Sequence, residues 1–506
     1  MGIRISEECV LKVLVIGAGF GGLAQALLSA KKGDEVLVIE KNESAGGRSS
    51  VYSEKGYTFD MGPSWYLMPD VYERYFRQFG KEPSELFALQ RLDPSYRIFF
   101  HDGRKVDISS DIEKNYALFD TLEKDGARKL KVYLEESREK YDAAILELLY
   151  RDYSRLTDFM DLKLMKQGRK LHLFENLEAF VNKHFESDEA KKIVEYSIGF
   201  LGGSPTNTPS FYHIMSHIDF TLGVWYPDGG MRGVVKAMYD MAVSMGVEFR
   251  FNEPVRKIVS EGKKVSKVVT DQGEYTADAV VVNVDYAHSE LELLTEKDRT
   301  YDNKYWEKKV LAPSAIVMYL GVNKKVPELA HHTLFLDKDW SSNFDEIFDP
   351  KKAAWPRSPS YYVNVPSLTD RTAAPEGKET LFVLAPLAPG LEDSPEIRER
   401  FYEQIMDHLE STLGTDIRKH VEVKRFFALD DFQDRYNAYK GTALGLTHTL
   451  RQTALFRPVH RSKRIKNLFY TGHYCHPGIG VPMVLISSQI VDGLLDECKC
   501  GGGPHG

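Results

Sequence analysis

The chain has 506 residues, of which 42% are hydrophobic and 28% are charged. This composition excludes disordered, collagen-like and low-complexity proteins, and the length predicts about three domains or one large domain with insertions. Lys and Arg number 66 against 74 Asp and Glu, so the formal net charge is −8 and provides no overall positive field for nucleic acid. Four cysteines are too few for a disulfide framework and favour a reducing compartment.

The N-terminal residues show no secretory signal, and no apolar stretch approaches the roughly 18 residues that span a bilayer. We therefore expect a cytoplasmic protein. Any contact with a membrane is expected to be peripheral.

A dinucleotide-binding unit is predicted near the N-terminus. Residues 11–16 form an apolar, β-branched run that predicts a strand, residues 23–32 have a helical period, and residues 35–39 predict a second strand. This order, with a glycine-rich turn after the first strand and an acid after the second, is typical of the βαβ unit that binds dinucleotides. The turn consists of Gly17, Ala18, Gly19, Phe20, Gly21 and Gly22.

Each of the motif residues has a physical role in such a unit. Gly17 permits the tight turn, Gly19 lets the backbone approach a pyrophosphate, and Gly22 allows close packing of helix and strand. Glu40 lies 18 residues after Gly22, where its carboxylate can accept both ribose hydroxyls. A carboxylate at this place repels a 2′-phosphate, which argues against NADP.

The residues after the acid favour FAD over NAD. Lys41 follows Glu40 directly, residues 46–48 are Gly-Gly-Arg, and residues 59–64 end in a second glycine-containing turn. Several glycine-rich turns with an arginine indicate a long anionic ligand that passes several loops. Arg48 is suited to bidentate contact with phosphate.

Residues 111–222 are expected to be mostly helical. Within them Lys163, Lys166, Arg169 and Lys170 form a basic cluster among apolar residues. A basic amphipathic helix of this kind can lie on an anionic membrane surface. The alternative is a solvated helix that packs on the core, and the pattern alone favours this alternative.

From residue 224 on, helices and strands alternate again. Residues 290–454, with strands such as 315–321 and 380–385, suit an antiparallel sheet. At the C-terminal end a strand at 467–471, a glycine-rich loop at 472–482 and an apolar helix at 483–495 are expected. The N-terminus of this helix can stabilise negative charge on a reduced flavin. The other expected elements are a helix at 233–244, strands at Glu248–Arg250 and 279–284, and a hairpin of 255–259 with 265–270.

These motifs resemble the FAD-dependent bacterial-type phytoene desaturases, which are carotenoid desaturases within the amine-oxidase-like flavoprotein superfamily. The segments 46–48 and 59–64 are shared across the superfamily. The segment 472–482, with its His-Pro-Gly-x-Gly-x-Pro motif, is more specific to carotenoid enzymes. The resemblance runs almost from end to end. It departs from the family at His473, Tyr474 and Cys475, where smaller residues are usual, and this leaves the exact substrate open.

The resemblance implies FAD as cofactor, a lipid-soluble polyene of the phytoene type as substrate, and quinone or oxygen as electron acceptor. It also implies contact with a membrane surface, since such substrates dissolve only in lipid. No metal is expected, because Cys498 and Cys500 with His505 lack the remaining ligands of a tetrahedral site. The turns and the resemblance together predict the cofactor-binding set Gly17, Ala18, Gly19, Phe20, Gly21, Gly22, Glu40, Lys41, Gly47, Arg48, Gly62, Pro63, Ser64, Val255, Gly472, Gly480 and Val481.

An α/β fold follows from the resemblance, with a discontinuous Rossmann-like FAD-binding domain, a substrate domain with a mixed β-sheet, and a helical region that could lie on a membrane. The expected segments are 1–75, 223–290 and 455–497 for the FAD-binding domain, 76–110 and 291–454 for the substrate domain, 111–222 for the helical region, and 498–506 for a flexible tail.

Desaturation removes a hydride and a proton from adjacent carbons, and the resemblance places a suspected charged group in residues 159–163. Asp161 is therefore the candidate acid or base, although an exposed helical aspartate is the commoner case. Two other classes stay open: a carotenoid isomerase or amine oxidase of the same fold, and a prenyl-lipid escort protein without flavin. The intact glycines, Glu40 and Arg48 argue against the escort.

Overall fold

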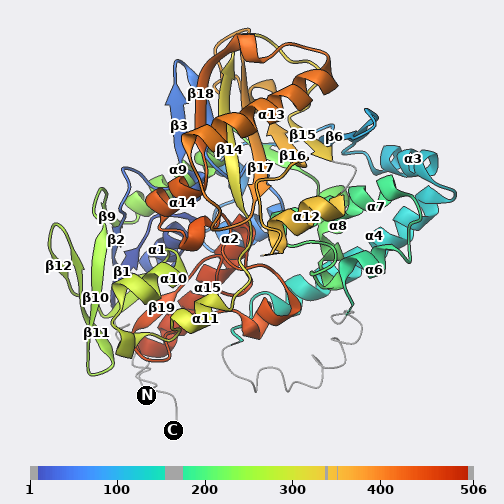
Figure 1. Cartoon of the computed structure of the whole chain (residues 1–506). Helices are drawn as coiled ribbons and strands as arrows, with labels where there is room; N and C mark the ends of the chain where they lie inside the picture. Colours follow the sequence, from blue (N-terminus) through green and yellow to red (C-terminus); the bar gives the residue numbers. More distant parts are fainter. Residues whose placement is uncertain (1–9, 154–174, 337–339, 350, 500–506) are drawn as a thin grey trace.

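The computed structural model describes residues 10–153, 175–336, 340–349 and 351–499 (Figure 1). A five-stranded parallel sheet is assembled from distant parts of the chain, in the order β19-β13-β1-β2-β9. All four residues of β13 are buried, as expected for a parallel strand covered on both faces. The strands are β1 (Lys12–Ile16), β2 (Glu35–Ile39), β9 (Glu248–Arg250), β13 (Ala279–Val282) and β19 (Leu468–Tyr470).

Three long helices cover this sheet. The central one, α1 (Phe20–Lys31), packs against both α9 (Met231–Ser244) and α15 (Val481–Lys499). Both α1 and α15 begin earlier than the predicted starts at residues 23 and 483. The reason for α1 is that Gly21 and Gly22 have no side chains to contribute to an apolar period, although their backbone is already helical.

A seven-stranded sheet forms the second layer, in the order β18-β14-β17-β16-β15-β6-β7. Its pairs are antiparallel except for β15 with β6, so the sheet is mixed. The strands are β6 (Tyr96–Phe100), β7 (Lys105–Ile108), β14 (Ser314–Val322), β15 (His332–Leu336), β16 (Tyr361–Asn364), β17 (Glu379–Leu387) and β18 (Val421–Phe427).

The two faces of this sheet pack against different partners. On β14, Ile316 and Met318 pack with the helix α13 (Pro395–Leu413), which lies across the sheet (Figure 1). Ala315 and Val317 face the opposite side, together with residues of the helical region. The strand period of two therefore gives the sheet one structural face and one face that is available to line a cavity.

Where the structure describes them, residues 111–222 are mostly helical, as predicted, and they lie to one side of the seven-stranded sheet (Figure 1). The predicted basic cluster at residues 163–170 and the candidate Asp161 lie outside the described residues. The helices and helical turns here are α3 (Ile112–Leu122), α4 (Gly126–Ala143), η3 (Ala144–Leu148), α6 (Leu177–Val181), α7 (Asp188–Glu195), η5 (Tyr196–Leu201), η6 (Ser210–His213), α8 (Ile214–His217) and η7 (Ile218–Leu222).

Smaller elements connect the layers. The predicted hairpin is present as β10 (Val255–Glu261) with β11 (Lys264–Thr270), extended by β12 (Glu274–Tyr275). The others are β3 (Val51–Glu54), β4 (Tyr57–Asp60), α2 (Pro69–Arg77), β5 (Leu89–Arg91), β8 (Trp225–Pro227), α10 (Tyr286–His288), α11 (Asn303–Glu307), α12 (Trp340–Phe348) and α14 (Leu429–Tyr436).

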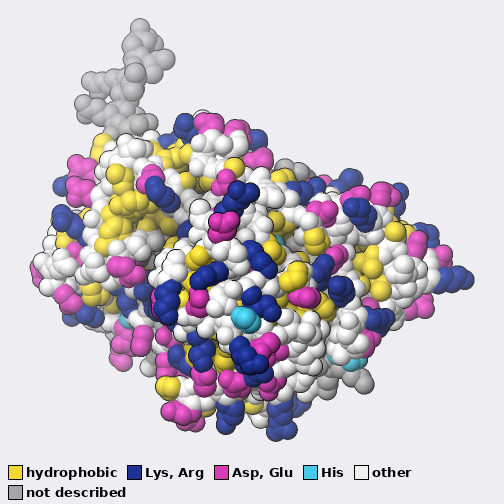
Figure 2. Space-filling model, turned by 90° about the horizontal axis from the view of Figure 1, so that it is seen from above, with side chains coloured by type: hydrophobic (Ala, Val, Ile, Leu, Met, Phe, Trp, Pro, Cys, Tyr) yellow, Lys and Arg dark blue, Asp and Glu magenta, His cyan; other side chains and the backbone are white. Residues whose placement is uncertain are grey.

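The surface carries both signs of charge. On the face in Figure 2, Lys and Arg side chains are interspersed with Asp and Glu, in keeping with a modest net charge of −8. Among the helices that the structure describes, none has both the length and the apolar character needed to cross a membrane.

Candidate functional site

A cavity of about 1140 Å³ extends from the parallel sheet to the inner face of the seven-stranded sheet. At one end its wall is formed where β1, β2, β13 and β19 finish, by residues such as Gly17, Glu40, Asn283 and Gly472. Parallel α/β sheets bind ligands at the carboxyl ends of their strands, because helix N-termini and loops converge there. This end of the cavity is therefore suited to a dinucleotide.

Two glycines of the glycine-rich turn lie too close to neighbouring backbone atoms to carry a side chain. Gly17 has φ +98°, and a Cβ on it would lie 2.6 Å from the carbonyl oxygen of Asn283. A Cβ on Gly22 would lie 1.9 Å from the carbonyl oxygen of Gly17. Gly22 and Ala18 do not line the cavity, whereas Gly17, Gly19, Phe20 and Gly21 do. Gly22 and Ala18 therefore shape the turn, and the four residues that line the cavity form its open surface.

Glu40 is buried at the end of β2 and lines the cavity. Its Oε2 accepts a hydrogen bond from the backbone N–H of Ala18 at 2.8 Å. Its Oε1 accepts from the backbone N–H and the side-chain amide of Asn42, at 2.9 and 2.8 Å. These bonds hold the carboxylate in place, and its oxygens keep lone pairs for further donors.

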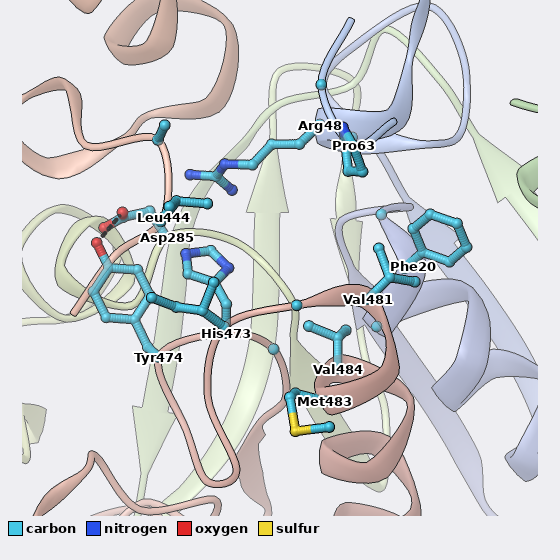
Figure 3. Close-up of a pocket in the computed structure, with 18 of the residues that line it drawn as sticks. Phe20, Arg48, Pro63, Asp285, Leu444, His473, Tyr474, Val481, Met483 and Val484 are labelled. Carbon is cyan, nitrogen blue, oxygen red and sulfur yellow. Dashed lines mark hydrogen bonds between the residues drawn. The ribbon is translucent and has the colours of Figure 1, made fainter. Parts of the chain in front are cut away.

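Arg48 extends its side chain into the cavity, toward Leu444 and above His473 (Figure 3). Its Nε and Nη2 atoms are buried and have no hydrogen-bond partner among the described residues. The Asp285 carboxylate interacts electrostatically with Arg48, but a buried N–H group without a hydrogen-bond acceptor is still unfavourable. The site is thus built for an anionic ligand, which the diphosphate of a dinucleotide satisfies.

Other predicted residues surround the same space. Gly47, Pro63 and Ser64 line the cavity, and so does Gly62, on which a Cβ would lie 2.5 Å from the carbonyl oxygen of Arg48. Val255 lines it as the first residue of β10, together with Lys41, Gly472, Gly480 and Val481.

The ammonium of Lys41 is engaged elsewhere, because its Nζ donates to the carbonyl oxygen of Asp434 at 2.6 Å and to Oδ1 of Asn437 at 2.9 Å. Burial lowers the pKa of Lys41. This lysine therefore fastens the 434–437 segment to the cavity wall.

Two residues that sequence reasoning missed hold the C-terminal loop. Arg457 is buried and donates to the carbonyl oxygens of His473, Tyr474 and Cys475, at 2.8, 3.2 and 3.2 Å. Asp285 accepts a hydrogen bond from the Tyr474 hydroxyl at 2.5 Å. Burial lowers the pKa of His473 well below its usual range, so this histidine is neutral. All three residues that depart from the family are therefore anchored, and two of them, His473 and Tyr474, line the cavity.

The other half of the cavity is apolar. Its walls come from the inner face of the seven-stranded sheet and from the helical region, and polar groups are few. The cavity reaches the surface at Leu450 and Phe456, which are 39% and 51% exposed. Representative wall residues are Leu201, Phe211, Ile214, Met215, Val317, Phe382 and Leu384.

The comparisons with known proteins agree with this geometry. A model of the flavin containing amine oxidoreductases matches residues 20–491. The carotenoid 3,4-desaturase of Haloarcula japonica is 47% identical over 488 residues, which cover 96% of this chain and 98% of that protein. The zeta-carotene-forming phytoene desaturase of Myxococcus xanthus is 32% identical over 487 residues, which cover 95% and 93%. A solved oxidoreductase from Methanosarcina mazei, 18% identical, shares the fold with a TM-score of 0.60 and coverage of 95% and 99%.

The chain belongs to the flavin containing amine oxidoreductase family, among its carotenoid desaturases. It is an oxidoreductase that acts on CH–CH bonds of carotenoids, and its cofactor is FAD. The mixed α/β fold, the cofactor and the enzyme class predicted from the sequence are thereby confirmed. The roles of individual cofactor residues stay predictions that the cavity geometry supports.

Proposed function

We propose that the enzyme desaturates a carotenoid at a bond of the 3,4 type. The support comes from the degree of similarity: the relative named for this reaction is 47% identical over nearly the whole chain, whereas the phytoene desaturase of Myxococcus xanthus is 32% identical. The observation that carries the proposal in this chain is the single cavity with a polar dinucleotide end and a long apolar end.

The residues present fit FAD. Glu40 would bind the adenosine ribose, and the backbone N–H groups after Gly19 with the Arg48 guanidinium would bind the diphosphate. The 62–64 and 472–481 segments, which line the same cavity, would flank the flavin. When bound, FAD supplies an acceptor for the hydride that leaves the substrate.

The protein's part in the reaction is alignment and exclusion of water. No carbonyl acidifies the reacting carbons, so the polyene next to them must spread the positive charge that develops as hydride leaves. Apolar wall residues such as Val317, Phe382 and Leu384 hold an extended hydrocarbon in one orientation, and they exclude water because they offer it no hydrogen-bond partners. A chain held in this way presents one C–H bond at a time.

We further propose that the enzyme takes its substrate from a membrane surface. Leu450 and Phe456 are large exposed apolar residues at the point where the apolar half of the cavity reaches the surface. A hydrocarbon that leaves a bilayer there would avoid water on its way in. The basic cluster Lys163, Lys166, Arg169 and Lys170 would attract anionic lipid, and salt would screen this attraction. A membrane quinone or oxygen would re-oxidise the cofactor.

The test uses the FAD-loaded enzyme with liposomes that contain either phytoene or an acyclic carotenoid with an extended conjugated system. The proposal expects a red-shifted absorption spectrum with the conjugated carotenoid and little change with phytoene. If the enzyme converted only phytoene, we would conclude that it is a desaturase of the phytoene type and not of the 3,4 type. No change with either carotenoid, in the presence of quinone, would contradict the proposed substrate class.

A further inference from the structure

A chain of polar groups interrupts the apolar wall of the cavity at the inner face of the seven-stranded sheet. The Ser64 hydroxyl lies 2.9 Å from the Tyr362 hydroxyl, and this lies 2.6 Å from Nδ1 of His332. Ser64 and Tyr362 line the cavity, whereas His332 is fully buried behind them. Ser64 belongs to the predicted cofactor segment, so Tyr362 lies at the boundary between the two halves of the cavity.

A second histidine lies beside this chain. The ring centroids of His331 and His332 are 4.5 Å apart, a ring contact without a hydrogen bond between them, and Nδ1 of His331 lies 2.7 Å from the hydroxyl of the half-buried Thr369. Burial lowers the pKa of His331 to about 3 and that of His332 well below its usual range. Both imidazoles are therefore neutral, and each has one nitrogen that can accept a proton.

The direction of the hydrogen bonds can be assigned at His332. The side-chain amide nitrogen of Asn364, which only donates, lies 3.4 Å from Nδ1 of His332. This contact favours the tautomer in which Nδ1 is the acceptor, with the Tyr362 hydroxyl as its donor. In addition, Trp65 stacks on the His332 ring with 4.1 Å between centroids, and an indole face stabilises a cation.

In a second tyrosine–histidine pair at the cavity, the hydrogen bond runs in the opposite direction, from histidine to tyrosine. The Tyr212 hydroxyl lies 2.6 Å from Nδ1 of His448, but Nε2 of His448 accepts from the backbone N–H of Ile479 at 3.1 Å. A neutral His448 therefore carries its proton on Nδ1 and donates to Tyr212. Tyr212 can pass no proton to this histidine, whereas Tyr362 can pass one to His332.

We propose that Tyr362, acting through His332, accepts the proton that carotenoid desaturation releases. The inference rests on the proposed function and deepens it, because it names a catalytic residue, Tyr362, and a positioning residue, His332, for the same site. The pair returns to its starting state when His332 releases its proton after each turnover.

The step balances as follows. FAD, when bound, would supply the acceptor for the hydride that leaves one carbon, and the C–H bond on the adjacent carbon would then break. Its electron pair forms the second bond of the new C=C, while its proton goes to the Tyr362 oxygen and the phenolic proton moves to Nδ1 of His332. A C–H bond beside a cationic carbon is strongly acidic, so a neutral tyrosine–histidine pair is basic enough.

The test compares Tyr362→Phe and His332→Gln with Tyr212→Phe and Tyr361→Phe. Tyr361 precedes Tyr362 in β16, but its hydroxyl pairs with Nδ1 of His408 at 2.7 Å on the helix-covered face. Each variant is assayed for FAD content, for carotenoid affinity by quenching of tryptophan fluorescence in micelles, and for anaerobic flavin reduction in a single turnover.

We expect Tyr362→Phe to slow flavin reduction by about 10²–10⁴-fold, as for loss of a general base, with FAD content and affinity unchanged. His332→Gln, which keeps an acceptor but cannot take the proton, should lower kcat with an unchanged KM. Tyr361→Phe, on the other face of β16, should reduce FAD at the wild-type rate, and Tyr212→Phe should slow flavin reduction far less than Tyr362→Phe. If Tyr362→Phe fails to fold, the flavin reduction rate of His332→Gln tests the inference.

Normal flavin reduction in both test variants would overturn the inference, and so would equal slowing in the controls. Slow flavin reduction in Asp161→Asn together with a normal rate in Tyr362→Phe would mean that Asp161, and not Tyr362, accepts the substrate proton. These outcomes are distinct from failure of the proposed function, in which the wild-type enzyme itself would not reduce its flavin with any carotenoid.

Discussion

The backbone N–H of Ala18 donates to the Glu40 carboxylate across 2.8 Å, although 22 residues separate them in the chain. This bond joins the glycine-rich turn after β1 to the acid after β2. The carboxylate expected to bind ribose therefore also fixes the shape of the turn expected to bind phosphate. Any change at Glu40 should affect both.

Glu40→Arg is expected to reduce the FAD content of the purified protein at least about tenfold. The variant loses the acceptor for the ribose hydroxyls and for Ala18, and hydrogen bonds to a charged group contribute about 1.5–3 kcal/mol each. Glu40→Gln keeps one side-chain oxygen acceptor and should retain more FAD. The ratio of flavin to protein absorbance measures both, and full FAD content in Glu40→Arg would refute the assigned role.

Gly22→Ala should lower the midpoint of thermal unfolding and release FAD, because the new Cβ would lie 1.9 Å from the Gly17 carbonyl oxygen. Gly493→Ala in α15 is the matched control, since a Cβ there meets nothing within 4 Å. Replacing a helical glycine by alanine stabilises by about 1 kcal/mol. Scanning calorimetry with flavin fluorescence reports both properties, and equal effects of the two substitutions would contradict the packing argument.

Phe456→Ser combined with Leu450→Ser should weaken co-sedimentation with anionic liposomes and lower activity on liposomal carotenoid, while FAD content stays normal. The reason is the loss of exposed apolar surface at the mouth of the cavity. Val243→Ser in α9 is the control, since Val243 is 47% exposed but does not line the cavity. If all variants sediment alike, the membrane contact does not lie at this mouth.

Electron balance separates a desaturase from an isomerase. Oxidised enzyme given its carotenoid without oxygen or quinone should bleach its flavin once and stop, because the hydride has nowhere else to go. Added quinone should restart turnover. An isomerase would instead work only with reduced flavin and consume no oxidant, and stopped-flow absorption under anaerobic conditions distinguishes the two patterns.

Asp219 should make stability depend on pH. It is buried, the hydroxyls of Tyr96 and Tyr196 donate to its Oδ2, and burial raises its pKa to about 7. Between about pH 4 and pH 7 the folded protein keeps a proton that the unfolded chain releases, so Asp219 lowers the free energy of unfolding as pH rises through this window.

Asp219→Asn removes this titration, so its stability relative to wild type should rise by roughly 1–4 kcal/mol from pH 4 to pH 8. Urea unfolding at several pH values measures the difference. Glu261→Gln, at an exposed position at the end of β10, should show no such trend. A constant difference for Asp219→Asn would mean that Asp219 does not hold its proton in the folded state.

Local sequence patterns predicted the elements that carry the dinucleotide end of the cavity. The strands at Glu35–Ile39 and Glu248–Arg250 were predicted with the bounds that the structure shows. Glu35–Ile39 could be predicted because a largely buried parallel strand is a short apolar run, and the turn could be predicted because backbone contacts at Gly17 and Gly22 admit no side chain. Such requirements are visible in the residues themselves.

The substrate end could not be predicted in the same way. Ser64, Tyr362 and His332 come from three distant parts of the chain, and only the pairing of β15 with β16 and the face that each side chain takes bring them together. Tyr361 and Tyr362 are identical neighbours in sequence, yet one faces α13 and the other the cavity.

The sequence by itself therefore determined the family, the cofactor and the glycine-rich turns, because these depend on residue type at short spacing. Only the tertiary structure decided which polar groups stand in the apolar wall, which way their hydrogen bonds run, and where the cavity opens. Those properties depend on sheet register and on packing between residues far apart in the chain, and no local pattern encodes either one.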